Sequence, residues 1–314
     1  MDASQYNAVK EKEMEYALKR VEDVKNSKDK YVMYRDIRPI IDLKQMIESS
    51  VELYGDNIAF HVKDKVGGPY RGIAYKEAKA DMDALGTALL SMGLKGKSIA
   101  VIGENRYEWA ISYLAVVCGT GVVVPLDKEL GASELEQLIK EADVECIIYS
   151  SKYESLFQEM KARGETKLRF LVNMDTEISD EERLSLSEII AAGKVLIENG
   201  NREFLDAQIE RDTMSIILFT SGTTGIAKGV MLSHGNIVED LMASPTLLSV
   251  VPEDVFFSVL PIHHTYECTC GFLMPIYRGA SVAYCEGLKY IVKNLSEARP
   301  TIFLGVPLIF ESLY

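Results

Sequence analysis

The sequence has few residues of the kinds that mark secreted, metal-binding or nucleic-acid-binding proteins. It holds one tryptophan, four histidines and five cysteines in 314 residues, and 47 acidic residues outnumber its 34 lysines and arginines. The formal charge of −13 argues against a nucleic-acid surface, because polyphosphate binding needs clustered positive charge. The cysteines are scattered and odd in number, which favours a reducing cytoplasm over a disulfide framework.

Segments typical of metal sites, secretion signals and membrane spans are also missing. Cys268 and Cys270 have no second pair at zinc-finger spacing, so we assign no metal site. The N-terminus is charged throughout and has no apolar signal core. The uncharged run 109–126 just reaches spanning length, but its glycines and proline predict a helix ending near Cys118 and a strand at Val122–Val124. We expect a cytoplasmic protein and leave peripheral membrane contact and oligomeric state open.

What the sequence does contain is a long alternation of short apolar strands and helices. A charged helix and linker come first, then a helix in 42–55 and a hairpin turning at Gly67–Gly68. From Tyr75 onward, strands are expected at 98–102, 122–124, 146–149, 168–172, 215–219, 256–259, 281–284 and 301–304. Helices are expected between them at 76–92, 107–118, 133–142, 185–199, 234–248, 265–277 and 288–298.

This alternation predicts an α/β fold with doubly wound, mostly parallel sheets covered by helices on both faces. The composition of 47% hydrophobic residues is enough for a large buried core. We divide the chain into an N-terminal helical and linker segment at 1–40, a first α/β subdomain at 41–205, and a second α/β region at 206–314 that is incomplete at its C-terminus.

The strand expected at 215–219 runs into a polar loop, TSGTTGIAKG, at residues 220–229. Ligands of open α/β sheets gather at the carboxyl ends of strands. Glycines allow close backbone approach, hydroxyls add donors, and Lys228 adds a positive charge, so the loop indicates polyphosphate binding. It is not a Walker A loop, since Ala227 precedes the lysine and Gly229 follows it. The alternative of a flexible surface turn is disfavoured because the loop joins a core strand to a second strand, KGVML.

The segment LFTSGTTGIAKGVMLSHGN at 218–236 resembles the signature of the acyl-adenylate-forming (AMP-binding) enzymes. This superfamily includes acyl-CoA synthetases, luciferases and the adenylation domains of peptide synthetases. Four further segments match in order, and together they look most like the N-terminal part of a long-chain fatty-acid CoA ligase. They are GENRYEW at 103–109, GTGVVVPLD at 119–127, LPIHHTYE at 260–267 and FLGVPLIFESLY at 303–314.

The resemblance implies a two-step ligase reaction. A carboxylate attacks Mg-ATP to give an acyl adenylate and pyrophosphate, and the thiol of coenzyme A then displaces AMP; ATP, Mg²⁺ and coenzyme A are thus the implied cofactors. Such chemistry depends on charge stabilisation and positioning. Ala227 stands where the family commonly has proline, which loosens the loop but removes no donor. The resemblance assigns phosphate binding to Thr220, Ser221, Gly222, Thr223, Thr224, Gly225 and Lys228.

Two further features of the resemblance concern the carboxylic-acid substrate. The family's LP-x-x-H pattern places His264 near the carboxylate, where imidazole can orient an anion, whereas His263 occupies a position usually aromatic or variable. LPIHHTYE lacks the aspartate by which amino-acid-activating relatives bind an amino group, which favours a fatty or other uncharged acyl chain. The helices expected at 234–248 and 265–277 offer apolar faces to that chain.

The chain stops at Tyr314, before the family's adenine, ribose and magnesium motifs, its hinge, and its C-terminal domain with a catalytic lysine. We therefore expect the N-terminal part of an acid–thiol ligase, inactive on its own. Two alternatives stay open: a noncatalytic nucleotide- or acyl-binding module, and an adenylating enzyme that loads a carrier-protein thiol.

Overall fold

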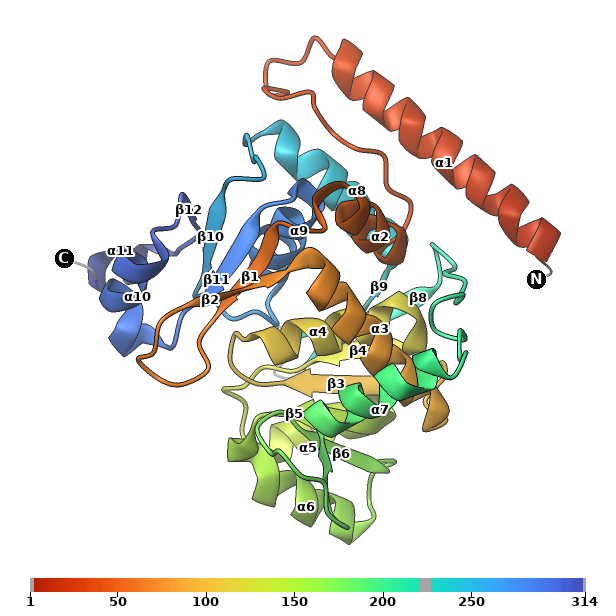
Figure 1. Cartoon of the computed structure of the whole chain (residues 1–314), viewed down its shortest axis with the longest axis vertical. Coiled ribbons are helices and arrows are strands. Elements are labelled where there is room, and N and C mark those ends of the chain that lie inside the picture. The colour runs from red at the N-terminus through yellow and green to blue at the C-terminus, as the bar shows by residue number, and fades with distance from the viewer. Residues whose placement is uncertain (1–2, 221–226, 313–314) are drawn as a thin grey trace. The chain divides into compact units, whose positions relative to one another are not determined.

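The computed structural model of the protein describes residues 3–220 and 227–312, and the chain forms two compact units. Each unit has its own sheet and is discontinuous in sequence (Figure 1). Unit 1 comprises residues 1–76, 208–213 and 233–314, and unit 2 comprises 77–207 and 214–232. This grouping by contacts differs from the continuous segments 1–40, 41–205 and 206–314, which remain a prediction about subdomains.

The sheet of unit 1 has the described strands in the order β12-β10-β11-β1-β2. Neighbouring strands pair in parallel, except that β1 and β2 form an antiparallel hairpin. The hairpin turns where the sequence predicts it, and Gly67 has a φ of 74°, a conformation that glycine adopts without strain. The strands are β1 (Ile58–Val62), β2 (Arg71–Ala74), β10 (Val255–Ser258), β11 (Ser281–Tyr284) and β12 (Ile302–Phe303).

The helices of unit 1 begin and end at residues with a clear physical role. The Asp42 side chain caps α2 by accepting the Gln45 N–H at 2.8 Å. The helix expected at 234–248 ends at Ala243, and a short 3-10 turn follows, because Pro245 cannot donate to the preceding turn. The helices are α1 (Ala3–Asn26), α2 (Leu43–Tyr54), α8 (His234–Ala243), α9 (Met274–Arg278), α10 (Ile291–Ala298) and α11 (Pro307–Ser312).

The sheet of unit 2 has the order β7-β6-β5-β3-β4-β8-β9, with parallel pairings from β7 to β8. Because β3 lies between β4 and β5, the direction of winding reverses there, and this confirms the doubly wound α/β prediction. The strands are β3 (Ser98–Ile102), β4 (Val122–Pro125), β5 (Val144–Tyr149), β6 (Phe170–Asn173), β7 (Leu184–Ser185), β8 (Met214–Thr220) and β9 (Lys228–Ser233). The helices are α3 (Tyr75–Ser91), α4 (Tyr107–Ala115), α5 (Ala132–Glu141), α6 (Glu154–Arg163) and α7 (Leu186–Glu198).

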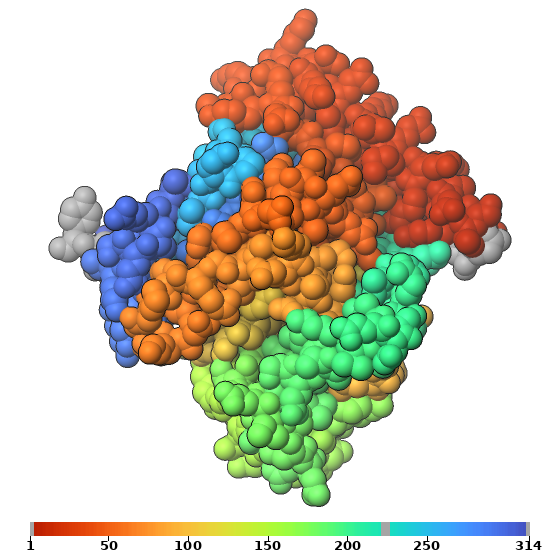
Figure 2. Space-filling model, viewed as in Figure 1, coloured from red at the N-terminus to blue at the C-terminus, as the bar shows by residue number. Residues whose placement is uncertain are grey.

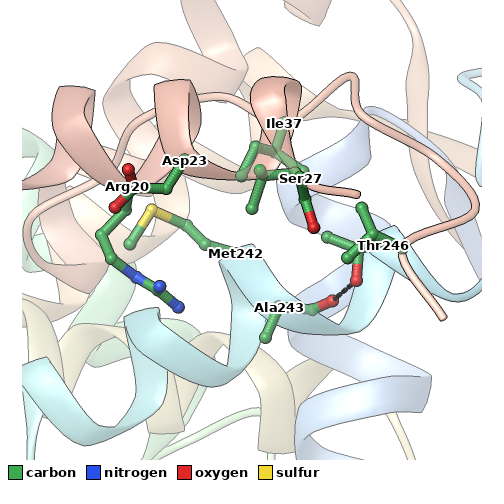
Figure 3. Close-up of a pocket in the computed structure, with 9 residues that line it drawn as sticks. Arg20, Asp23, Ser27, Ile37, Met242, Ala243 and Thr246 are labelled. Atoms are coloured by element: carbon green, nitrogen blue, oxygen red, sulfur yellow. Dashed lines mark hydrogen bonds between the residues drawn. The ribbon is translucent and has the colours of Figure 1, made fainter. Parts of the chain in front are cut away.

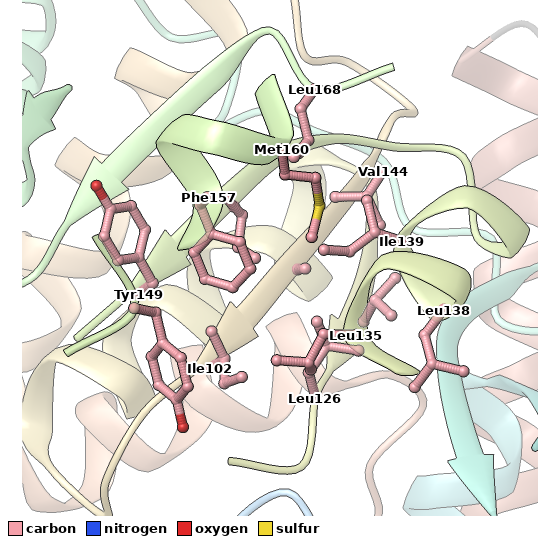
Figure 4. Close-up of a cluster of buried hydrophobic side chains, with 14 of the residues drawn as sticks. Ile102, Leu126, Leu135, Leu138, Ile139, Val144, Tyr149, Phe157, Met160 and Leu168 are labelled. Carbon is pink, nitrogen blue, oxygen red and sulfur yellow. The ribbon is translucent and has the colours of Figure 1, made fainter. Parts of the chain in front are cut away.

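A cluster of buried side chains forms the core on one face of this sheet (Figure 4). Phe157 and Met160 enter the cluster from α6, and the ring of Phe157 meets that of Tyr149 edge-on at 5.3 Å between centroids. The sequence does not predict α6, because this segment has only a few apolar positions among charged ones. Its two buried residues, Phe157 and Met160, are nevertheless three positions apart, which is the spacing of residues on one face of a helix.

The uncharged run 109–126 is divided as its glycines and proline predict. Helix α4 ends at Ala115, a π-helical turn at Val116–Thr120 follows with Gly119 at a φ of 150°, and β4 begins at Val122. Within residues 3–220 and 227–312, no helix combines the length and apolar composition needed to cross a membrane.

Candidate active site

The strands on either side of the polar loop are anchored on the core of unit 2. Ile217 and Phe219 of β8, and Ala227 just before β9, pack against the buried cluster. Thr220 at the end of β8 and Lys228 at the start of β9 are exposed. The core therefore fixes the backbone at both ends of the loop and leaves the hydroxyl and the ammonium group available to a ligand.

Gly229, one of the glycines that the loop motif links to close approach of a ligand, also has a packing role in the structure. A Cβ atom at this position would lie 3.1 Å from Cγ2 of Ile217 and 3.3 Å from Cε1 of Phe219. Its φ is not positive, so the backbone conformation does not require a glycine here. The short distances to these two side chains do favour a residue without a Cβ atom. It lets β9 lie close over the side chains of β8.

Five of the predicted phosphate-binding residues lie outside the described residues. They are Ser221, Gly222, Thr223, Thr224 and Gly225. Their assignment stays a prediction. The structure does establish that Thr220 ends a strand that pairs in parallel with β4, the position at which ligands of such sheets are usually held.

The GENRYEW segment after β3 is bonded to the residues that follow the neighbouring strand β5. The Glu104 carboxylate accepts a hydrogen bond from the Ser150 hydroxyl at 2.6 Å and pairs with the Lys152 ammonium at 2.8 Å. Burial opposes its ionisation, but these two hydrogen bonds outweigh burial and lower the pKa of Glu104 to about 2. Trp109 is fully buried and stacks on Tyr113 with 5.4 Å between ring centroids. The motif thus supports the fold directly.

In unit 1, His264 lies in the turn between β10 and the following helix. Its carbonyl accepts the Cys268 N–H at 2.9 Å, and its side-chain Nδ1 accepts the Tyr266 N–H at 3.3 Å. The neutral imidazole therefore carries its proton on Nε2. The ring is exposed and lies at a helix N-terminus, so Nε2–H can be offered to an anion. His263, beside it, is half-buried.

Glu267 is a buried carboxyl group one turn after His264 that the sequence analysis did not single out. Its Oε1 accepts a 2.5 Å hydrogen bond from the Ser258 hydroxyl, and Oε2 has no partner among the described residues. Burial raises the pKa of Glu267 to about 8, and the bond from Ser258 opposes that rise only in part. A Cβ on Gly271 would lie 2.6 Å from the Glu267 carboxyl carbon, so the carboxyl group rests on this glycine.

The local backbone explains how the carboxyl group fits there. Residues Glu267–Leu273 form a π-helical segment inside the helix that the sequence predicts at 265–277. Such segments, with i→i+5 hydrogen bonds, are rare and frequently lie at functional sites. The signal available in the sequence was one acidic residue directly before the otherwise uncharged stretch CTCGFLMP.

The apolar stripes expected to line an acyl site are largely packed in unit 1. Phe272 and Leu273 are fully buried, as is Leu241 of α8. A pocket of about 290 Å³ lies on another side of α8, bordered by α1, the segment after it, Met242 and Thr246 (Figure 3). The pocket includes neither His264, Thr220 nor Lys228. The acyl-binding assignment remains a prediction.

A protein metal site needs several ligand side chains close together. Across residues 3–220 and 227–312, no three or more His, Cys, Asp or Glu side chains group in a way that would hold an ion. Neither Cys268 nor Cys270 forms a disulfide, and burial raises the pKa of Cys270. We therefore assign no described residue to magnesium.

With this geometry established, comparison with known proteins identifies the family. The sequence profile of the AMP-binding enzymes matches residues 47–314, which is most of the chain. The chain belongs to the AMP-binding enzyme family. This acyl-adenylate-forming family has long-chain acyl-CoA synthetases among the relatives that resemble the chain over about 80% of its length.

Two of these relatives come from a plant and a mammal. Long chain acyl-CoA synthetase 2 of Arabidopsis thaliana is 30% identical over 264 residues, covering 80% of this chain and 39% of that protein. Long-chain-fatty-acid–CoA ligase 6 of Homo sapiens is 31% identical over 259 residues, covering 78% of this chain and 37% of that protein. The chain thus spans about two fifths of the length of the curated relatives it matches.

Solved structures of family members share the fold. The anthranilate CoA ligase AuaEII, in complex with anthranoyl-AMP, superposes with a TM-score of 0.76 at 19% identity, covering 86% of this chain and 51% of that one. The N-terminal domain of FACL13 from Mycobacterium tuberculosis gives 0.73 at 18% identity, covering 87% and 64%. These likenesses confirm the expected architecture of the N-terminal region of acyl-adenylate-forming enzymes.

Proposed function

We propose that the protein takes part in the ATP-dependent activation of a long-chain fatty acid to an acyl adenylate and its transfer to coenzyme A. The observation that carries this proposal is the family match over 47–314 together with the strand–loop–strand unit that leaves Lys228 exposed. Relatives named as long-chain acyl-CoA synthetases support the choice of substrate and acceptor. The five scattered cysteines, which form no disulfides, support a cytoplasmic location.

Lys228 is the residue proposed to neutralise the outer phosphates of ATP. Its ammonium group is exposed at the first position of β9, while β8 and Ala227 hold the backbone on the core. A compact positive charge suits a phosphate that gains charge as it leaves. Thr220 adds a hydroxyl at the other end of the loop, and the sequence supports Ser221, Gly222, Thr223, Thr224 and Gly225 as further donors.

His264 is the residue proposed to orient the carboxylate of the fatty acid. Because Nδ1 accepts the Tyr266 N–H, the ring presents Nε2–H outward as a donor. A fixed donor restricts the carboxylate to fewer orientations, which raises the fraction of reactive encounters. When bound, Mg-ATP supplies the electrophilic phosphorus and coenzyme A supplies the thiol. We assign neither Mg²⁺ nor coenzyme A to a described residue.

The proposal is tested with the product of the complete reading frame. Purified protein is incubated with palmitate, ATP, Mg²⁺ and coenzyme A, and pyrophosphate and palmitoyl-CoA are measured over time. Omitting coenzyme A should leave pyrophosphate release but abolish the thioester. Pyrophosphate release that requires a carrier protein in place of coenzyme A, or ATP binding without any turnover, would refute the proposal.

A further inference from the structure

The loop that carries His264 is closed at its base by a buried hydrogen bond. Ser258 ends β10, and Glu267 begins the π-helical segment that follows the loop. The Ser258 hydroxyl donates to Oε1 of Glu267 at 2.5 Å, and both side chains are fully buried. This bond therefore joins the two ends of the stretch 259–266.

The strand end that provides the hydroxyl is itself held in the core of unit 1. The Ser258 carbonyl accepts the Cys285 N–H, just after β11, at 3.1 Å. Strands β10 and β11 are almost fully buried, and in Figure 2 the red and orange residues of unit 1 cover part of its blue segments on the side shown. Ser258 is thus a fixed point to which Glu267 is attached.

The loop also has internal restraints. The side chains of Leu260 and Ile262 are buried, and the His264 N–H donates to the Pro261 carbonyl at 2.9 Å. The His264 carbonyl accepts the Cys268 N–H at 2.9 Å. Because Cys268 directly follows Glu267 in the chain, the positions of the carboxyl group and of the His264 backbone are coupled within one turn.

The His264 ring depends on a long hydrogen bond for its orientation. Nδ1 accepts the Tyr266 N–H at 3.3 Å, which is near the upper limit for such a bond. The ring is exposed, so neighbouring side chains restrict it little. A displacement of Tyr266 by about 0.3 Å would break this bond and release the ring. Tyr266 directly precedes Glu267, so its position depends on how Glu267 is held.

Stability alone does not explain a carboxyl group at position 267. Its Oε2 has no partner among the described residues, and an unpaired polar atom in the core costs free energy. An apolar side chain of similar volume would avoid that cost and could rest on Gly271 in the same way. It could not accept the hydrogen bond from Ser258. What the carboxyl group adds is the connection between the two ends of the loop.

We propose that Glu267 is a positioning residue that fixes, through Ser258, the turn that carries His264. The carboxyl group touches no reacting atom in this role. It keeps the Tyr266 N–H where Nδ1 of His264 accepts it, so that Nε2–H stays directed toward a carboxylate. This inference rests on the proposed role of His264 in adenylation.

The first test compares Glu267→Met and Glu267→Gln in the product of the complete reading frame. Methionine keeps the volume but has no acceptor oxygen for Ser258, and it suits a buried apolar position. Glu267→Met should stay folded by circular dichroism, yet adenylation of palmitate should fall by at most about tenfold, the loss expected for His264→Ala. Thioester formation from preformed palmitoyl adenylate should be nearly unchanged.

Glu267→Gln should restore most of the adenylation rate at pH 7. Because the pKa of Glu267 is about 8, its carboxyl group is neutral at this pH, and glutamine is neutral as well and keeps an acceptor oxygen for Ser258. A rate in Glu267→Gln as low as in Glu267→Met would contradict the proposal. So would equal losses in the two half-reactions of Glu267→Met, which would leave Glu267 a stabilising role only.

A double variant tests whether Glu267 acts through His264. Adding Glu267→Met to His264→Ala should cause no further loss of adenylation, because the group to be positioned is already absent. Losses that multiply would overturn the proposal. Thr87→Val is the matched control: it also replaces a buried polar group by an apolar one of similar size, and the Thr87 hydroxyl donates to the Asp83 carbonyl at 2.8 Å in unit 2. It should show no preference between the half-reactions.

Hydrogen–deuterium exchange of the segment 259–268 provides a readout that needs no turnover. Its backbone amides should exchange faster in Glu267→Met than in the wild type, and at the wild-type rate in Glu267→Gln and Thr87→Val. Unchanged exchange in Glu267→Met would overturn the proposal. A wild-type protein that releases no pyrophosphate would refute the proposed reaction, whereas the exchange rates would still decide whether Glu267 fixes the turn.

Discussion

The end of β8 in unit 2 and the end of β10 in unit 1 are built in opposite ways. At the end of β8, apolar side chains pack inward, and the polar groups of Thr220 and Lys228 stand in solvent. At the end of β10, the exposed His264 lies in sequence between the two members of a buried polar pair, Ser258 and Glu267, which are joined at 2.5 Å. The first region separates binding chemistry from stability, whereas the second places a titratable group inside the core.

The difference has a direct energetic meaning. Replacing an exposed charged residue changes stability little, since water already solvates it. Replacing or ionising a buried carboxyl group changes the free energy of unfolding, since its charged form has lost that solvation. Substitutions near β8 should therefore affect ATP binding alone, and those near β10 should affect stability and its pH dependence.

The largest effect is expected from Glu267→Gln on the pH dependence of stability. Burial raises the pKa of Glu267 from its ordinary 4.5 to about 8 in the folded protein. Between these values the folded state keeps a proton that the unfolded state releases, so this group's stabilisation is complete below pH 4.5 and is lost as pH rises toward about 8. The slope contributed is at most about 1.4 kcal/mol per pH unit.

Glutamine cannot ionise, so the variant should lack this contribution. Urea unfolding of both proteins across the same pH range measures it: their difference in free energy of unfolding should move steadily in favour of the variant as pH rises. Parallel pH profiles would mean that Glu267 is solvated, and they would remove the contrast between the two strand ends.

Lys228→Ala should give the next largest effect, on ATP-dependent pyrophosphate release. A charge-assisted contact contributes about 1.5 to 3 kcal/mol, so the rate should fall by roughly ten- to a hundredfold or more. The free energy of unfolding should change by less than about 0.5 kcal/mol, because the side chain is exposed. Lys167→Ala is the matched control, since Lys167 is an exposed lysine paired with Asp143. Wild-type rates in the Lys228 variant would reject the phosphate assignment.

His264→Ala should have a smaller, more selective effect. Loss of one hydrogen bond to the carboxylate corresponds to roughly a tenfold drop in adenylation of palmitate. Thioester formation from preformed palmitoyl adenylate should be nearly unchanged, because that molecule has no free carboxylate. His263→Ala provides the comparison and should reduce adenylation less. Equal losses in both half-reactions would assign His264 a structural role.

Most of the fold could be predicted because its signals are local. Strand 98–102 and the hairpin at Gly67 were predicted where the structure has them, since apolar runs and turn residues determine them independently of distant contacts. Helix α6 could not be predicted because its segment is largely polar and charged, and only Phe157 and Met160 of it are buried. The interleaving of two units could not be predicted either, since it depends on contacts between segments far apart in the chain.

The candidate site divides in the same way. The polar loop at 220–229 and the LP-x-x-H pattern are motifs, so Lys228 and His264 could be selected from the sequence. Glu267 could not be assigned a role, because its meaning depends on burial and on Ser258, which comes nine residues earlier and meets it only in the folded chain. The packing of Gly229 against Ile217 and Phe219 could not be predicted either, because a contact across two strands is not visible in a motif.

The smallest effect is expected from Ser233→Ala, at the junction of β9 and α8. The Ser233 hydroxyl accepts the Asn236 N–H at 3.3 Å, and the Asn236 side-chain oxygen accepts the Ser233 N–H at 3.0 Å, which together start α8. Loss of such a cap costs about 0.5 to 2 kcal/mol, and the long first bond favours the lower end of this range. Asn236 is exposed, so water can solvate its freed N–H. Urea unfolding should therefore show a loss of about 0.5 to 1 kcal/mol in the free energy of unfolding. This loss should be restored in Ser233→Thr, which keeps the acceptor oxygen.

Calorimetric titration of the Ser233→Ala variant with ATP should give an unchanged dissociation constant, since the cap lies at the far end of β9 from Lys228. Weaker ATP binding at equal stability would show that the β8–β9 loop depends on how α8 begins, and the separation of binding from stability at that strand end would no longer hold.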